Sequence, residues 1–136
     1  MELNEALEFL RANHRSVLIA RRSDGEPQPS PVVHGVDAAG TIVVSSREPA
    51  YKVRNLRRDP RVTLCAFTDN FFGKWVSVEG GAAIVSLPEA MEPLEDLYRQ
   101  VAGEHPDWDD YRKAMAREQR VIIAITPTAA GPDRSG

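Results

Sequence analysis

Three prolines alternate along one short segment of this chain, in the run Pro27-Gln28-Pro29-Ser30-Pro31. Proline has no backbone N–H, and in an extended strand the N–H groups of alternate residues point to the same side. One side of the segment therefore lacks hydrogen-bond donors and cannot pair with a neighbouring strand there. The segment is predicted to form the edge of a sheet, with the N–H groups of Gln28, Ser30 and Val32 on the other side.

An edge of this kind has two explanations. Prolines protect exposed strands against aggregation, and for the segment taken alone this is the favoured explanation. Alternatively, the prolines stiffen a wall along which a flat ligand lies. The residues themselves leave both explanations open.

The rest of the chain alternates between short apolar runs and turn sequences. Strands are expected at 16–20, 28–36, 41–46, 61–68, 74–85 and 120–126, because these runs are rich in β-branched residues. Asp24-Gly25 favours a hairpin turn, and Gly80-Gly81 within a long strand indicates a bulge.

Helical spacing of apolar residues predicts helices at 3–13, 48–58, 87–102 and 107–118, with Pro49 in the first helical turn of the second. The tail from Pro127 to Gly136 lacks apolar periodicity and is expected to fray. The length suits one domain, 1–136. The predicted fold class is mainly β (α+β), a barrel of about six antiparallel strands with short flanking helices.

Composition excludes several classes of protein. With 17 Lys and Arg against 20 Asp and Glu, the net charge is −3, which argues against nucleic-acid binding. No apolar run reaches the roughly 20 residues of a membrane span, and the acidic N-terminus does not resemble a signal peptide. A cytoplasmic location is therefore expected. One cysteine and three histidines argue against a disulfide framework and a structural zinc site.

Positive charge is concentrated between Arg47 and Arg61, which indicates a local anion site. Two hydroxyls, Ser45 and Ser46, precede the helix that carries Lys52 and Asn55. Helix N-termini offer free N–H donors, so this arrangement could cradle a phosphate. The alternative is a capped helix with a solvated basic face, and spacing alone favours that alternative.

Few other residues suggest chemistry. Trp75 begins a strand and belongs either to the core or to a stacking wall, Cys65 is expected to be an inert core thiol, and His34 to be a satisfied structural residue. There is no Ser/His/Asp pattern, pair of catalytic carboxylates or glycine-rich phosphate loop. No catalytic side chain is therefore expected.

The order of elements resembles the split β-barrel family of pyridoxamine 5'-phosphate oxidase, and within it the actinobacterial F420-dependent oxidoreductases. The most specific stretch is Lys52-Val53-Arg54-Asn55-Leu56-Arg57-Arg58-Asp59-Pro60-Arg61. Further matching stretches lie at 24–30, 48–51, 75–80 and 98–111, the last of which contains Glu104-His105-Pro106-Asp107-Trp108.

The resemblance implies a homodimer with two cofactor sites between the subunits. Lys52 would grip the cofactor phosphate, with Ser45, Ser46 and Asn55 around it. The strand formed by Gln28, Pro29, Ser30, Pro31, Val32 and Val33 would lie along the ring, which favours the second explanation of the prolines, and Trp75 would line the pocket. The activity implied is hydride transfer between F420 and a small electron-poor organic acceptor.

Two alternatives stand beside this activity: a non-enzymatic F420 carrier, and a flavin mononucleotide (FMN) protein of the pyridoxamine-phosphate-oxidase type. Surplus arginines favour F420, because they could hold its polyglutamate tail. One departure from the resemblance is Ala129-Ala130-Gly131, where family members often carry an aromatic before the glycine. The substrate side of the ring would then be less covered.

Overall fold

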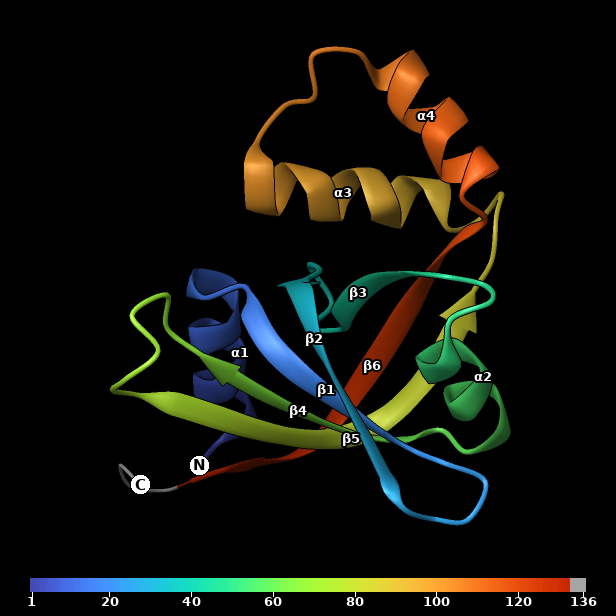
Figure 1. Cartoon of the computed structure of the whole chain (residues 1–136). Helices are drawn as coiled ribbons and strands as arrows, with labels where there is room; N and C mark the ends of the chain where they lie inside the picture. Colours follow the sequence, from blue (N-terminus) through green and yellow to red (C-terminus); the bar gives the residue numbers. More distant parts are fainter. Residues whose placement is uncertain (133–136) are drawn as a thin grey trace.

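Six antiparallel strands close into one barrel, in the order β1-β2-β3-β6-β5-β4 (Figure 1). The computed structural model describes residues 1–132. Its strands are β1 (Arg15–Arg21), β2 (Pro27–Val36), β3 (Ile42–Arg47), β4 (Arg61–Phe67), β5 (Trp75–Val85) and β6 (Arg120–Gly131). Its helices are α1 (Leu3–Ala12), α2 (Tyr51–Arg58), α3 (Met91–Ala102) and α4 (Trp108–Arg117). The predicted fold class is confirmed.

The barrel is split between β2 and β3. Residues 27–33 of β2 pair with β1 along their whole length, whereas β3 pairs only with His34, Gly35 and Val36. The His34 N–H donates to the carbonyl oxygen of His14 at 3.0 Å, so even-numbered residues of β2 face β1 and the prolines face the split. The predicted edge is confirmed.

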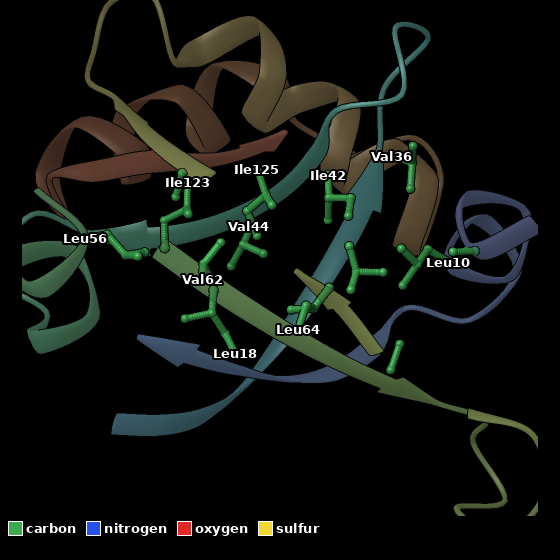
Figure 2. Close-up of a cluster of buried hydrophobic side chains, with 14 of the residues drawn as sticks. Leu10, Leu18, Val36, Ile42, Val44, Leu56, Val62, Leu64, Ile123 and Ile125 are labelled. Carbon is green, nitrogen blue, oxygen red and sulfur yellow. The ribbon is translucent and has the colours of Figure 1, made fainter. Parts of the chain in front are cut away.

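The barrel interior is filled by alternate residues of the strands. Figure 2 shows side chains from several strands converging there, with Leu10 of α1 and Leu56 of α2 at opposite ends. Leu18, Ile42 and Ile123 are fully buried, each with 0% exposure. Burial of each such side chain stabilises the fold by about 1.5–3 kcal/mol. The two helices thus close the ends of the barrel.

A second apolar cluster joins α3 and α4 to the outer face of β3 and β6 (Figure 1). A side chain at Gly35 would crowd this contact, since a Cβ there would lie 2.8 Å from Leu97 Cδ1. Gln100 of α3 also accepts a hydrogen bond from the Val36 N–H at 3.0 Å. Glycine therefore lets α3 approach the paired end of β2.

The predicted bulge in β5 is confirmed by a register shift between Glu79 and Gly80. A Cβ on Gly80 would collide with the carbonyl oxygen of Thr126. The bulge bends β5 around the barrel and lets β6 continue beside it.

Two predictions about element ends are wrong. The tail does not fray from Pro127, because 127–131 continue β6 and pair with β5; here strand pairing replaces the apolar periodicity that the tail lacks. The α2 helix begins at Tyr51, not at 48, because Ala50 is extended and its N–H closes a turn on Arg47, which leaves Pro49 outside the helix. Residues 133–136 of the predicted tail lie outside the described residues.

His34 joins three elements inside the barrel. Its ring is fully buried, its Nε2 donates to the carbonyl oxygen of Leu10 at 3.2 Å, and its Nδ1 accepts from the Ser16 hydroxyl at 2.8 Å. These partners suit the neutral ring. Desolvation by burial lowers the pKa of His34 to about 4. The prediction that this histidine is structural agrees with these contacts.

This buried ring predicts a loss of stability in mild acid. Between pH 6.5 and 4 the unfolded chain binds a proton on His34 that the folded protein does not, so stability falls as the pH is lowered through that range. We expect a loss of about 2–3 kcal/mol in the free energy of unfolding between pH 7.5 and 4.5. Urea denaturation at the two values measures it. A His34→Gln variant with the same pH dependence as the parent would contradict the assignment.

Candidate functional site

Predicted site residues lie on both sides of the split between β2 and β3: Gln28 to Val33 are on β2, Ser46 is at the end of β3, and Lys52 and Asn55 are on the α2 helix that follows β3. Val53 and Leu56 anchor α2 in the barrel core, where they are 0% and 2% exposed. Lys52 and Asn55 are three residues apart and share another face of the helix, as the sequence predicts. The geometry of the barrel end therefore follows from one short amphipathic helix.

Asn55 ties this helix to the proline-bearing strand. Its Nδ2 donates to Gln28 Oε1 at 3.1 Å, and its Oδ1 accepts from Arg58 Nη1 at 3.1 Å. Arg58 in turn donates to the carbonyl oxygen of Arg21 at 2.6 Å. A chain of side-chain hydrogen bonds thus fixes the distance between α2 and the β1–β2 hairpin.

The basic segment divides into neutralised and free cations. Arg57 is paired with Glu48 and Arg61 with Asp59, each with an N–O distance of 2.7 Å. Across residues 1–132, Arg47, Lys52 and Arg54 form no ion pair or side-chain hydrogen bond. The predicted anion site is therefore narrower than the six cations in the sequence indicate.

Lys52 is the cation of this group that lies partly inside the protein. Burial and, to a smaller degree, the charge of Arg47 lower the pKa of the Lys52 ammonium. Both effects would be relieved by a bound anion, which would neutralise the pair and accept hydrogen bonds from it. The split thus has uncompensated positive charge at its α2 end.

The two serines do not point to the same place. Successive strand residues face opposite sides of the sheet. Ser46 is 6% exposed and lies two residues after the barrel-facing Val44, so it shares the inner face of β3. Ser45 lies on the other face, where Arg120 Nη1 is 3.5 Å from its hydroxyl. Only Ser46 lies on the barrel side that α2 closes. The predicted placement of both hydroxyls around one phosphate does not match this alternation.

The wall predicted from Gln28 to Val33 also alternates. Gln28, Ser30 and Val32 are half-buried, whereas Pro29, Pro31 and Val33 are exposed, Val33 by 48%. The Ser30 hydroxyl is buried and has no hydrogen-bond partner within residues 1–132. An unsatisfied buried hydroxyl is uncommon, because it costs about 1–3 kcal/mol.

Trp75 is not part of this arrangement within one chain. It pairs with Phe67 at the start of β5 and lines a separate surface cavity of about 330 Å³ with Ser77 and Ala130. The α2 end of β5 is near Ala82, whose N–H donates to Pro60. At the usual rise of a strand, roughly 20 Å separates the two positions.

A cavity of about 490 Å³ on the outer barrel face was not predicted from the sequence. It is lined by residues of β1, β2, β4, β5 and β6, among them Pro27, and its polar lining includes Arg21, Arg61, Thr63, Glu79 and Thr128. The bulge at Gly80 and the extension of β6 form it together. The bulge was predicted from the sequence, but the extension of β6 was mispredicted as a frayed tail, so the sequence indicated only one of the two features that form the cavity.

The Glu104-His105-Pro106-Asp107-Trp108 motif lies in the helical hairpin, away from the split. Asp107 caps α4 by accepting from the Asp110 N–H, and Trp108 Nε1 donates to Glu104 at 3.1 Å. The Trp108 ring packs edge-on against Tyr98 and Tyr111. These contacts give the motif a structural role in joining α3 to α4.

Within residues 1–132, no cluster of three His, Cys, Asp or Glu side chains could hold a metal ion. No helix in the described part of the chain is long and apolar enough to cross a bilayer.

A barrel split at a proline-bearing strand, with a cationic helix across the opening, defines the class of fold. Residues 3–131 match the pyridoxamine 5'-phosphate oxidase family. The chain belongs to that family, and the resemblance found in the sequence is confirmed at this level.

Several solved structures share the fold. A conserved hypothetical protein, Rv2991 from Mycobacterium tuberculosis, is 24% identical with a TM-score of 0.78, and the match covers 100% of this chain and 92% of that one. An F420 reductase is 24% identical with a TM-score of 0.70, covering 91% and 94%. HutZ, a heme storage protein from Vibrio cholerae, is 16% identical with a TM-score of 0.71, covering 96% and 94%. Proteins with different ligands thus share this barrel.

The unpartnered Ser30 hydroxyl predicts an unusual response to mutation. Ser30→Ala removes a hydroxyl that makes no hydrogen bond in the free protein. We therefore expect the free energy of unfolding to stay within about 0.5 kcal/mol of the parent value or to rise. Ser16→Ala is the matched control, since it removes a buried hydroxyl that donates to His34, and it should cost about 1–3 kcal/mol. Equal losses in urea denaturation would mean that Ser30 has a partner.

Proposed function

We propose that this protein is an oxidoreductase that binds the deazaflavin F420 and supports hydride transfer between it and a small electron-poor organic acceptor. The observation that carries the proposal is the pair of unneutralised cations, Lys52 and Arg47, beside a strand edge without donors. Such a site suits a phosphate joined to a flat ring. The fold shared with an F420 reductase supports the same proposal.

The residues of the split fit this cofactor in distinct ways. Lys52 and Arg47 would hold the phosphate, with the Ser46 hydroxyl on the barrel side and the Asn55 amide beside them. The edge from Gln28 to Val33 would lie along the ring, held in place by the bond between Asn55 and Gln28. When bound, F420 supplies the hydride chemistry itself. The chain's own task is to orient the ring and exclude water.

F420 and FMN both join a phosphate to a tricyclic ring, so the difference lies in the polyglutamate tail of F420. Arg57 and Arg58 are already engaged by Glu48 and by the Arg21 carbonyl. Arg54 and Arg47 are therefore the arginines left to attract the tail. Because exposed ion pairs contribute only about 0–1 kcal/mol each, the preference for F420 would be modest and would weaken in salt.

A carrier is the second candidate function. It is favoured by a heme storage protein with the same fold, and it needs no acid or nucleophile, a feature that it shares with the oxidoreductase because F420 supplies the hydride chemistry. Turnover distinguishes the two: an oxidoreductase oxidises reduced F420 when a nitroaromatic or quinone acceptor is added, whereas a carrier binds F420 without consuming it.

The phosphate contact predicts a contrast between two cations of α2. Lys52→Ala removes a charge-assisted hydrogen bond worth about 1.5–3 kcal/mol, so affinity for F420 should fall roughly ten- to hundred-fold. Arg57→Ala is the control, because it removes the same charge from the same helix but from a residue neutralised by Glu48. Fluorescence titration measures both. Similar losses would indicate general attraction rather than a seated phosphate, and no loss in either would refute the site.

The distance between Trp75 and Lys52 predicts a homodimer whose site uses both chains. Lys52→Ala and Trp75→Ala should each bind F420 poorly. If Trp75 acts on the site of the other subunit, mixed dimers of the two variants contain one intact site, and refolding them together should restore about a quarter of all sites. Sedimentation at micromolar concentration should show the dimer. A monomer, or no restored binding, would contradict this arrangement.

A further inference from the structure

The exposed edge of β2 carries acceptors but not donors between Pro27 and Pro31. In a strand, the N–H and C=O groups of one residue point to the same side. Because the even-numbered residues face β1, the carbonyl oxygens of Pro27, Pro29 and Pro31 face the split. Among residues 1–132, β3 pairs with β2 only at His34, Gly35 and Val36, and no other hydrogen bond is made to these three oxygens. The corresponding N–H positions are proline nitrogens.

This pattern excludes a polypeptide strand as the natural occupant. A strand added to an edge alternates donors and acceptors, and its own carbonyl groups need N–H partners. Three successive positions here cannot supply them. Pairing with a second copy of β2 would fail for the same reason. A small molecule is free of this requirement, because it need not present acceptors at a fixed spacing.

The same pattern constrains which side of a small molecule can face the edge. A ligand carbonyl or ring nitrogen opposite these oxygens would repel them and would lose its hydration without replacement. A ring N–H or O–H would instead gain a hydrogen bond to an oxygen that is held in place by the stiff backbone. The edge is therefore selective for donors.

We infer that the carbonyl oxygens of Pro27, Pro29 and Pro31 form a recognition edge for ring N–H or O–H donors of the bound cofactor. The inference rests on the proposed function. Both F420 and FMN carry an imide N–H in their pyrimidine ring, and F420 also carries a phenolic hydroxyl at the far end of its ring system. Either group would meet the edge as a donor. The prolines then set the orientation of the ring, in addition to protecting the strand.

Blocking the donor tests this recognition edge. The protein is titrated separately with F420, with FMN, with the N3-methyl derivative of each, and with the phenolic methyl ether of F420. At least one blocked derivative should bind roughly ten-fold more weakly than its parent molecule, in line with one lost hydrogen bond and one desolvated oxygen. If every blocked derivative binds as well as its parent, the edge does not face a ring donor and the inference is overturned.

A variant of the edge separates hydrogen bonding from the bulk of the added methyl group. Pro29→Ala adds an N–H to the edge, which can pair with a ring carbonyl in place of the blocked donor, so the ratio of parent to blocked affinity should fall at least three-fold. Pro49→Ala, in the turn before α2, should leave the ratio unchanged. An unchanged ratio in Pro29→Ala would show that the methyl group acts by size alone, against the inference. If neither F420 nor FMN binds the parent protein, the proposed function itself fails, together with the inference that rests on it.

Discussion

The missing N–H groups of three alternate prolines are the constraint on which the rest of this structure depends. Pro31 lacks the N–H that would face Arg47 at the end of β3, and β3 ends before it reaches Pro29 or Pro27, so β2 and β3 stay unpaired beyond His34 and the barrel is split. The α2 helix lies across that opening, held by Val53 and Leu56 in the core and by the Asn55–Gln28 hydrogen bond at the edge. The prolines thus contribute to the opening and determine the chemistry of its wall.

Charge at the opening depends on pairing rather than on the number of cations. The basic segment has six cations in the sequence, but Glu48 and Asp59 neutralise Arg57 and Arg61, and Arg58 is committed to the hairpin. What remains is Lys52, whose pKa is lowered by burial, with Arg47 beside it and Arg54 nearby in the sequence. A narrow site with few free cations suits one phosphate better than an extended polyanion.

Local patterns predicted the fold well, and the failures have physical causes. The edge at the prolines, the bulge at Gly80 and the buried face of α2 follow from backbone donors, glycine and helical spacing, all of which are local. The extension of β6 to Gly131 depends on β5 beside it, so the tail carried no signal of its own. The ion pair of Arg57 with Glu48 depends on the turn that places Glu48 beside α2, and the separation of Trp75 from Lys52 depends on the closed barrel. The opposed directions of Ser45 and Ser46 could have been deduced from strand alternation.

The spacing of the prolines also has an evolutionary consequence. At the register of its paired end, β3 would lie opposite Pro31 at Arg47 and ends there, so Pro27 and Pro29 have no strand beside them on that side. Substituting either of these two prolines therefore leaves the opening in place. Lys52 is less easily replaced, because Arg57 and Arg58 of α2 are committed to other partners and Arg47 and Arg54 are exposed rather than half-buried. Single mutations can thus change which ligand binds at the opening more readily than they can close the opening.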